Sequence, residues 1–579
     1  MAKDNKNKMQ LRIFVVQFFL LAAFVLLGVK SVQLQIFEAD TLNRLAEKEY
    51  SGYILMKGKR GKIFDKHMKE LSTSIDTLSL AASPSRVKNP RTAASKLSAI
   101  LDTEKSSIYA KLTKDTGFTW IKRRISPELA GRIKQERIDG IFFKHDTRRY
   151  YPNRGLAAQV LGFTGFDNKG LEGLEYRFND ELAGKDVKIR IVKDATGKRL
   201  DTEKRFKSKF TGNSLVLTLD KKIQFVTKQA LEHAVTSQNA KSGLAVVMKP
   251  STGEILAMAH HPGFNPNRFQ AFSRERWRNR AVTDQFEPGS VMKVFLAATA
   301  LEHNISTPRS IFFCENGDFD IGRYTIHDTH PHGWLTLRQV IKYSSNIGAA
   351  KIGTSMGNQI LYNALTDYGF GRKTGIRCPG ETPGRLWHPG KWSEIDRASI
   401  AFGQGIAVSA IQLISGISAI ANDGVLMKPL LVKQIISDDG TVQAAFHPQR
   451  AARVISSRTA RQTQDIMQAV ISEEGTGSNA IMNGYSVCGK TGTAQKVAED
   501  GNGYSKSRYT SVFAGFSPAD DPELAVLVVV DEPRKNHYGG VVAAPAFKNI
   551  LSESFQYLGI PPEKRTPEIV AEVSGGDGV

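Results

Sequence analysis

The chain has 579 residues, too many for one domain, so we expect two or three domains. Its formal net charge of +22 would suggest a nucleic-acid partner in a cytoplasmic protein. However, the sequence has no zinc-finger spacing, RNA-binding signature or phosphate-cradling loop, so we expect no nucleic-acid partner. The basic excess instead suits anionic lipid headgroups, carboxylate-bearing polymers or solvent.

The N-terminus predicts a membrane anchor. Residues 1–12 are mostly polar and basic, and the segment 13–36 is almost wholly apolar up to Lys30. That length can span a bilayer, and the preceding basic flank predicts a cytoplasmic tail with the rest of the chain outside. The alternative is a cleaved signal peptide. Lys30 and Gln33 crowd its only candidate cleavage residue, Ser31, so we favour an uncleaved single-pass anchor in contact with lipid.

Two folded regions follow the anchor. Residues 40–235 form a mixed segment with turn-rich loops and no catalytic constellation, which predicts a non-catalytic domain. A second domain is expected over 242–556. Beyond it, residues 557–579 are rich in Pro, Glu and Gly and are expected to be disordered.

The second domain predicts an α+β fold. Segments 244–249 and 254–259 flank a Pro-Ser-Thr-Gly turn and indicate a hairpin. Segments 510–516 and 523–530 indicate two more strands, and helices are expected between about 290 and 425. This pattern predicts an antiparallel sheet with a helical cluster.

An S-x-x-K motif at Ser290 and Lys293 predicts a nucleophile with its base. Positions i and i+3 share one face of a helix, and an apolar, helix-favouring run follows Ser290. Pro288 and Gly289 place Ser290 near the helix start, where its backbone N–H is free to stabilise an oxyanion. The alternative is a plain N-cap serine.

A second S-x-x-K match, Ser85 to Lys88, lacks this context. Pro84 precedes it, and Pro90 follows shortly after Lys88. No helix can continue through that stretch. We therefore assign the nucleophile to Ser290 rather than Ser85.

The K-T-G-T sequence at residues 490–493 is expected on a strand, with Gly492 inside it. A glycine in a strand often marks the close approach of another backbone, and a peptide could add to such a strand edge. The other K-T-G match begins at Lys373 in a Gly- and Pro-rich loop, which favours a turn.

Ser344 and Asn346 form an S-x-N motif in a helical stretch or at a break in one. They could serve as a proton relay beside Lys293. The alternative is an ordinary polar cluster at a helix end. A further S-x-N match, Ser237 to Asn239, shows that the motif by itself carries little information.

The three cysteines give no disulfide framework, because their number is odd and their spacing wide. Whether Cys314 and Cys378 pair is left open. Cys314 also opens a stretch rich in Asp and His that ends at His332. That stretch lacks the ligand spacing of a zinc site, so no metal is expected.

Taken together, these motifs resemble the class B penicillin-binding proteins, and two blocks resemble the FtsI-type cell-division branch of that family, namely 330–336 and 342–347. The resemblance covers roughly residues 12–555. Its other blocks are 60–65, 149–152, 170–175, 286–289, 402–405 and 539–547.

The resemblance implies a membrane-anchored peptidoglycan D,D-transpeptidase with an elongated pedestal (dimerisation) domain and a penicillin-recognising catalytic domain. Ser290 would attack the carbonyl between two terminal D-alanines, and Lys293 would take its proton. Ser344 and Asn346 would relay that proton to the leaving amine. β-Lactams would trap Ser290.

The strand residues complete the expected site. The backbone N–H groups of Ser290 and Thr493 would form the oxyanion hole. The resemblance implies that Lys490, Thr491 and Thr493 recognise the terminal carboxylate, with Gly492 between them. No cofactor is expected. The expected partners are stem peptides, a multi-pass membrane glycosyltransferase and other division proteins.

Three alternatives stay open at this point. Water could resolve the acyl-enzyme, which would make the protein a carboxypeptidase, or the acyl-enzyme could persist without turnover in an antibiotic-sensing role. The chain could be a membrane-tethered scaffold with a vestigial site, although its intact motifs argue against this. The biological role could be side-wall elongation or sporulation in place of septal synthesis.

Overall fold

The computed structural model describes residues 2–56, 58–192, 210–498 and 503–563. Its Cα positions divide into two compact units. The first comprises Met1–Gly58 with Gly184–Thr211, and the second comprises Lys59–Ala183 with Gly212–Val579. The segment 40–235, expected to be one non-catalytic domain, is therefore shared between the two units.

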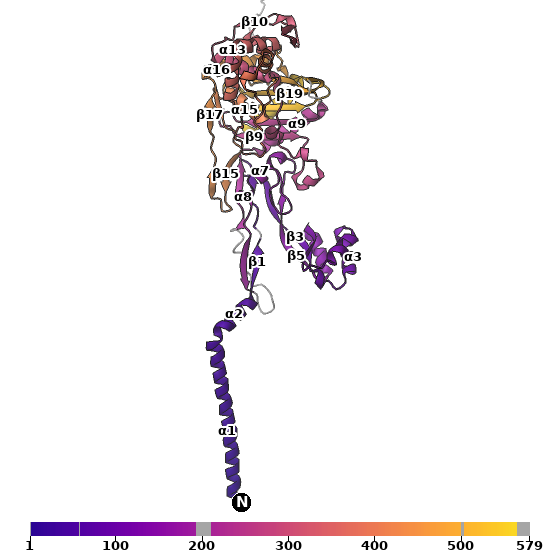
Figure 1. Cartoon of the computed structure of the whole chain (residues 1–579), viewed down its shortest axis with the longest axis vertical. Helices are drawn as coiled ribbons and strands as arrows, with labels where there is room; N and C mark the ends of the chain where they lie inside the picture. The colour runs from indigo at the N-terminus through magenta and orange to yellow at the C-terminus, as the bar shows by residue number, and fades with distance from the viewer. Residues whose placement is uncertain (1, 57, 193–209, 499–502, 564–579) are drawn as a thin grey trace, which may run out of the picture. The chain divides into compact units, whose positions relative to one another are not determined.

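The first unit contains the apolar N-terminal helix (Figure 1). Helix α1 (Ala2–Val32) continues into a π-helical turn, η1 (Gln33–Phe37), and α2 (Ala39–Tyr50) follows. The stretch Asn5–Phe37 is long and apolar enough to cross a membrane, and its apolar side chains are exposed on all sides. This pattern suggests membrane anchoring. The unit also contains an antiparallel pair, β1 (Ser51–Met56) with β6 (Val187–Val192).

The N-terminal part of the second unit is built around a mixed sheet with strand order β16-β15-β7-β2-β3-β4, to which β5 adds by pairing with β3. Three helices enclose a small separate core with β3 to β5, including Leu80, Leu97, Ile108 and Ile121. The bounds are β2 Ile63–Phe64, β3 Glu70–Ala82, α3 Pro90–Leu101, α4 Lys105–Leu112, β4 Thr119–Ile125, α5 Pro127–Gln135, β5 Ile141–Tyr150, β7 Ser214–Leu217, β15 Val432–Ile436 and β16 Val442–Ala445.

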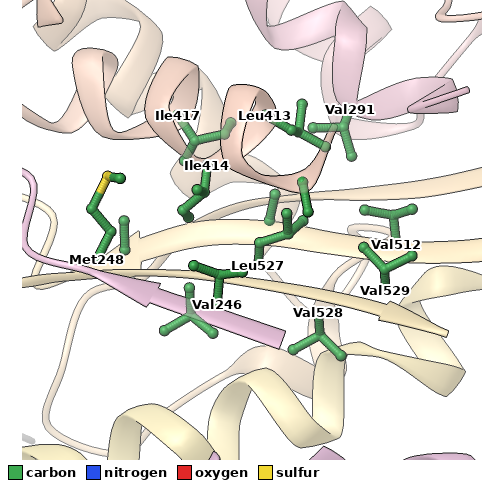
Figure 2. Close-up of a cluster of buried hydrophobic side chains, with 14 of the residues drawn as sticks. Val246, Met248, Val291, Leu413, Ile414, Ile417, Val512, Leu527, Val528 and Val529 are labelled. Carbon is green, nitrogen blue, oxygen red and sulfur yellow. The ribbon is translucent and has the colours of Figure 1, made fainter. Parts of the chain in front are cut away.

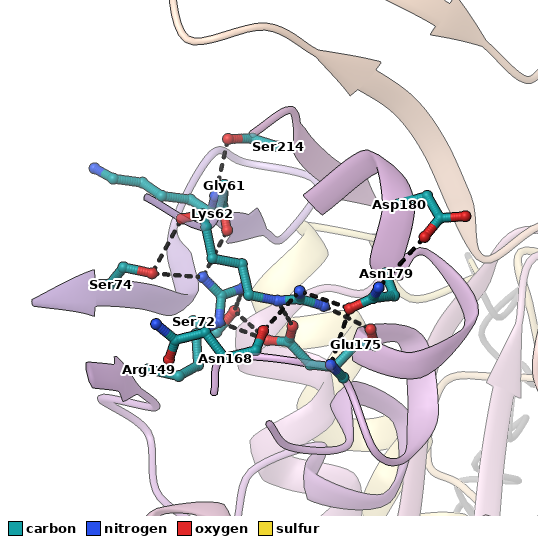
Figure 3. Close-up of polar contacts among 12 residues, drawn as sticks. Gly61, Lys62, Ser72, Ser74, Arg149, Asn168, Glu175, Asn179, Asp180 and Ser214 are labelled. Carbon is teal, nitrogen blue, oxygen red and sulfur yellow. Dashed lines mark hydrogen bonds and ion pairs between the residues drawn. The ribbon is translucent and has the colours of Figure 1, made fainter. Parts of the chain in front are cut away.

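A buried ionic cluster ties this region together (Figure 3). Glu175, in the short helix α7 (Gly173–Arg177), accepts hydrogen bonds from Arg60 Nε at 2.5 Å and Arg149 Nε at 2.6 Å. All three side chains are at most 2% exposed. Burial alone would raise the pKa of Glu175, but the two arginines outweigh it and hold the pKa below its usual value. The cluster joins three of the blocks in which the sequence resembles the penicillin-binding proteins.

The second unit also contains a five-stranded antiparallel sheet with order β18-β19-β20-β8-β9. The hairpin and the two strands expected from the sequence form here, and the K-T-G-T segment lies on the edge strand β18. Because the central strands are covered on both faces, they form continuous apolar runs. The bounds are β8 Ser242–Met248, β9 Ile255–His261, β18 Cys488–Val497, β19 Tyr504–Ser517 and β20 Leu524–Asp531.

Helices cover both faces of this sheet. Leu413, Ile414 and Ile417 of α15 (Ala410–Ala421) lie over its strands, and α18 (Ala544–Leu558) lies on the opposite side (Figure 2). The remaining helical cluster carries the polar motifs. Its helices are α11 Met292–Glu302, α12 Leu337–Lys342, α13 Asn346–Asp367, α14 Glu394–Ala401 and α16 Ser457–Val470.

Two boundaries differ from the sequence expectation. Helix α9 (Lys221–Ser237), placed by sequence in the non-catalytic domain, packs on β8, β9 and α18. Its apolar face includes Ile223 and Leu231, which need the sheet for burial. The expected disordered tail from 557 is also structured at its start: the Glu563 carboxylate accepts hydrogen bonds from Ser486 N at 2.8 Å and Oγ at 2.6 Å. The rest of that tail, 564–579, lies outside the described residues.

Candidate active site

Ser290 lies in a tight turn pressed against the edge strand. A 3-10 turn, Gly289–Val291, leads directly into α11. Gly289 has φ +55°, and a Cβ there would lie 3.0 Å from the Thr493 carbonyl oxygen. Glycine is therefore required both for the backbone conformation and for the close approach. The turn places the half-buried Ser290 beside β18.

Lys293 lies one turn further along and is fully buried. Its Nζ donates to the Ser344 carbonyl oxygen at 2.5 Å and to Asn346 Oδ1 at 2.8 Å, and lies 3.3 Å from Ser344 Oγ. Within the described part of the chain, no hydrogen bond joins Lys293 Nζ to Ser290 Oγ. The amine is thus fixed by the S-x-N motif, with the nucleophile one helical turn before it.

The S-x-N motif lies at a break between α12 and α13. Ser344 has φ +62°, a left-handed conformation that is uncommon for a residue with a side chain. The next residue, Ser345, caps α13 by accepting a hydrogen bond from Gly348 N at 2.9 Å. This break turns both Ser344 and Asn346 toward Lys293, as their hydrogen bonds show.

Asp328 holds the break in place. Its carboxylate accepts hydrogen bonds from Ser345 Oγ at 2.5 Å, from Ile347 N at 3.1 Å and from Asn346 N. A carboxylate at a helix N-terminus is favoured both by the free N–H groups and by the helix dipole. Asp328 lies in the Asp- and His-rich stretch that raised the question of a metal site, and the family-like block 330–336 that follows it was the signal for its present position.

Lys490 reaches the same hydroxyl from the sheet. Its Nζ lies 3.0 Å from Ser344 Oγ, 3.1 Å from the Thr491 carbonyl oxygen and 3.2 Å from Thr491 Oγ1. Ser344 Oγ therefore stands between two buried amines, one from α11 and one from β18. This arrangement joins all three sequence motifs through a single hydroxyl group.

Burial makes both amines weakly basic. Loss of solvent lowers the pKa of Lys293 to about 7, despite the opposing effect of the Asp328 charge. Burial also lowers the pKa of Lys490 well below its ordinary value, and repulsion from Lys293 lowers it further. The repulsion between the two amines thus acts on the pKa of Lys490.

The edge strand brings its backbone to the Ser290 turn. A Cβ on Gly492 would lie 2.7 Å from the Pro288 carbonyl oxygen, so this strand glycine allows the contact predicted from sequence. Thr493 Oγ1 accepts a hydrogen bond from Gly539 N at 3.1 Å, and Thr491 Oγ1 bonds to Thr476 Oγ1 at 3.0 Å. Among the described strands, β18 pairs only with β19, so it forms an edge of the sheet.

The structure separates this constellation from the other motif matches. Ser85 lies in the 3-10 turn Pro84–Arg86, outside any α-helix. Lys373 lies in a loop and lines a different cavity. The three cysteines are buried and unpaired, which answers the open question about Cys314 and Cys378. Sequence reasoning also missed Gly403, where a Cβ would overlap the Gly289 carbonyl oxygen, at 2.0 Å.

Comparison with known proteins agrees with this geometry. The sequence profile of the penicillin binding protein transpeptidase domain matches residues 243–552, and that of the penicillin-binding protein dimerisation domain matches residues 55–217. The chain therefore belongs to the penicillin-binding protein family, as a class B member with both domains. The fold expected from the sequence, an apolar helix followed by dimerisation and transpeptidase domains, is confirmed.

Named relatives span nearly the whole chain. It is 34% identical to stage V sporulation protein D of Bacillus subtilis, over 96% of this chain and 87% of that protein. It is 31% identical to the peptidoglycan D,D-transpeptidase FtsI of Escherichia coli K12, over 94% and 92% respectively. Penicillin binding protein 3 of Mycobacterium tuberculosis, solved with aztreonam, superimposes with a TM-score of 0.69 at 28% identity, over 88% of this chain and 98% of that one.

Proposed function

We propose that this chain is a peptidoglycan D,D-transpeptidase that forms an acyl-enzyme at Ser290. The observation that carries the proposal is the placement of Ser344 Oγ between Lys293 Nζ at 3.3 Å and Lys490 Nζ at 3.0 Å, beside the Ser290 turn. A buried amine with a pKa of about 7 can act as a general base at neutral pH. The names of the relatives, which include peptidoglycan D,D-transpeptidases, support the same activity.

In the proposed reaction, Ser290 Oγ attacks the carbonyl carbon between the two terminal D-alanines of a stem peptide while Lys293 Nζ accepts its proton. The backbone N–H groups of Ser290 and Thr493 stabilise the oxyanion. As the C–N bond breaks, the proton held by Lys293 Nζ passes through Ser344 Oγ to the leaving D-alanine amine, while Asn346 Oδ1 holds Lys293 in place. Ser290 is left as an ester of the shortened peptide.

The edge strand holds the substrate in this scheme. Lys490, Thr491 and Thr493 bind the terminal carboxylate, and the peptide backbone adds to the free edge of β18, with Gly492 giving it close access. A second stem's amine then attacks the ester, releases Ser290 and forms the cross-link. A β-lactam acylates Ser290 in the same way, but its ring-opened product stays attached.

Covalent labelling with a fluorescent penicillin tests the nucleophile. Ser290→Ala should abolish the label, because it removes the hydroxyl that is proposed to attack the lactam carbonyl. Ser85→Ala is the matched control, since it removes the serine of the other S-x-x-K sequence and should label like the unaltered protein. A Ser290→Ala protein that still labels covalently would refute the assignment.

The fate of the acyl-enzyme separates the transpeptidase from a carboxypeptidase. With a D-Ala-D-Ala peptide and an added amine acceptor, the transpeptidase should yield cross-linked product together with free D-alanine. Free D-alanine without any cross-linked product would show hydrolysis in its place. If the Ser290→Ala protein restores growth to a strain depleted of the unaltered protein, a scaffold role would be favoured over a catalytic one.

We further propose a septal role, with α1 in the cytoplasmic membrane, the N-terminus inside and both domains outside. The basic residues before the apolar run support this orientation. Likeness to FtsI supports septal synthesis, and likeness to the sporulation protein makes sporulation the second candidate. A multi-pass glycosyltransferase and other divisome proteins would be the partners. Depletion should produce long filaments; round cells would favour elongation.

A further inference from the structure

A basic cavity of about 380 Å³ lies in the second unit, and none of the residues of the proposed reaction line it. Its lining comes from segments that are distant in the sequence, namely 373–377, 428–432 and 446–449. The first of these begins with Lys373, Thr374 and Gly375, the K-T-G match that the proposed active site does not use. This sequence therefore lines a separate hollow with a chemistry of its own.

The charged side chains that line this cavity are all basic. They are Lys373, Arg377 and Lys428, with the exposed ring of His447 beside them, and no Asp or Glu belongs to the described lining. Within the described chain, none of the three cations forms an ion pair, and the side-chain hydrogen bond of Lys428 goes to Gln449 Oε1 at 3.4 Å. A hollow lined by charges of one sign concentrates counter-ions. The cavity therefore favours an anion.

Arg377 is held in position by an aromatic ring. Its guanidinium lies over Phe446, with the central carbon 3.7 Å from the ring centroid. Stacking of this kind uses the flat face of the guanidinium and leaves the N–H groups at its rim free to donate. In the described part of the chain these N–H groups form no hydrogen bond. A donor fork that is already positioned loses less freedom when an anion binds.

The carboxylate of Glu381 shapes the cavity's loop and does not neutralise its cations by contact. Its Oε1 accepts hydrogen bonds from Thr374 N and Thr374 Oγ1, both at 2.6 Å, and its Oε2 accepts one from Gly375 N at 3.3 Å. Neither oxygen pairs with Lys373 or Arg377 in the described structure. The loop that carries these two cations is thus fixed from behind, and their charge stays available to a ligand.

The amount of positive charge indicates which anion fits. Two ammonium groups and a guanidinium exceed what a single carboxylate can neutralise. A phosphoryl group offers three acceptor oxygens and nearly two negative charges, and guanidinium and ammonium groups are its usual partners in proteins. Leu430, Leu431 and Val432 add an apolar wall, on which an attached organic group can rest. Linked phosphoryl groups therefore suit the cavity better than a carboxylate.

We propose that this cavity binds a ligand that carries a diphosphate group. Arg377 donates paired hydrogen bonds to one phosphoryl group, and Lys373 and Lys428 neutralise the other. The same chemistry occurs in soluble phosphate compounds and in lipid headgroups, which differ in the apolar chain that could meet the leucine and valine wall. The inference is independent of acyl transfer at Ser290.

Calorimetric titration of the full-length protein in detergent, with inorganic diphosphate and without divalent cations, tests the proposal. Binding should saturate, and acetate, which carries one carboxylate, should bind at least about tenfold more weakly. Arg377→Gln should weaken diphosphate binding about tenfold, as expected for the loss of one charge-assisted contact. Arg372→Gln is the matched control, because it removes an exposed arginine of the same loop that does not line the cavity, and it should bind diphosphate like the unaltered protein.

Lys373→Gln gives a second test that does not disturb packing, since Lys373 is exposed and has no side-chain partner among the described residues. It should also weaken diphosphate binding. Failure to saturate at millimolar diphosphate, equal binding of acetate, or unchanged affinity in both Arg377→Gln and Lys373→Gln would overturn the proposal. Penicillin acylation of Ser290 should be the same in these variants, so the cavity and the proposed function are tested separately.

Geranyl diphosphate distinguishes the two sources of the ligand. Tighter binding than that of inorganic diphosphate would support the site and assign the ligand to the lipids, because the apolar chain then adds contact with the wall at Leu430 and Val432. Equal affinity would support the site and assign the ligand to the soluble compounds. Binding of geranyl diphosphate that Arg377→Gln leaves unchanged would count against the site, since detergent uptake of the chain would then account for the heat.

Discussion

Two lysines meet at one serine hydroxyl in a setting that excludes water. Desolvation is the largest influence on the pKa of each amine. An isolated charge is expensive to bury, and an amine responds by releasing its proton. A pKa of about 7 places Lys293 where a general base for neutral pH should lie. The structure thus supplies the neutral amine that the S-x-x-K pattern only implied.

The acylation rate should rise with pH through about 7, because only the neutral form of Lys293 can take the Ser290 proton. The rate rises with pH because Lys293 acts as a base, and raising the pH increases the fraction of its amine that is neutral. The second-order rate with fluorescent penicillin, followed about two pH units either side of neutrality, measures this. A profile that is flat there would contradict Lys293 as the base.

Asp328→Asn should shift the midpoint of this pH profile below about 7. Burial lowers the pKa of Lys293 and the Asp328 charge raises it. Without that charge, the pKa of Lys293 should fall further. Asp318→Asn is the control, because Asp318 is exposed in the same segment and pairs with His327. The same rate measurement gives the midpoint independently of any loss of maximal rate. A midpoint that stays in place or moves upward would argue against the Asp328 effect.

Among the structural elements, the edge strand β18 and the turn that carries Ser290 hold each other in position through close backbone contact. Gly289 and Gly492 each bring backbone to a place where a side chain would collide. The break between α12 and α13 is equally specific, since capping by Ser345 and Asp328 fixes where α13 begins. The proposed oxyanion hole therefore rests on contacts between segments that are distant in the sequence.

Gly492→Ala should lower the penicillin acylation rate at least about a hundredfold while the protein stays folded. Its Cβ would lie 2.7 Å from the Pro288 carbonyl oxygen and would push β18 away from the turn. Displacing one oxyanion-hole donor typically lowers rates by about 10²–10³. Gly131→Ala in α5 is the control, because a Cβ there meets nothing within 4 Å. Near-normal acylation by Gly492→Ala would show that the contact is not needed.

Local sequence pattern predicted the elements better than the links between them. The apolar run after Ser290 predicted α11, and the residues around Gly492 predicted β18. The left-handed Ser344, the capping carboxylate of Asp328 and the approach of Gly403 to Gly289 could not be predicted. Each depends on a contact across a long stretch of chain, which local periodicity does not encode. The packing of α9 on the five-stranded sheet was not predicted for the same reason.

At the scale of the second unit, we expect stability to depend on the buried ionic cluster around Glu175, which includes none of the proposed catalytic residues. Arg60, Arg149 and Glu175 bring the segment before β2 together with β5 and α7, and Tyr151 OH lies 3.3 Å from Glu175 Oε1. Such a cluster contributes little while it is intact, because desolvation offsets attraction. Breaking it leaves a buried charge without a partner.

Glu175→Gln should reduce the free energy of unfolding by about 3–5 kcal/mol, because two buried guanidinium groups lose their counter-ion. Asp76→Asn is the matched control: it breaks the exposed Lys59–Asp76 pair, 2.7 Å apart, and should have little effect. Chemical denaturation of the full-length protein in detergent compares the two. Equal midpoints for both variants would show that the cluster is dispensable.

The anchoring of Glu563 to Ser486 has a practical consequence for work on this enzyme. Ser486 precedes β18 by two residues, so the C-terminal end of the described chain braces the approach to the carboxylate-binding strand. Shortening the protein to the end of α18 would leave the Ser486 amide and hydroxyl without their acceptor. A purification tag or a truncation site is therefore best placed after Glu563, where it leaves this brace intact.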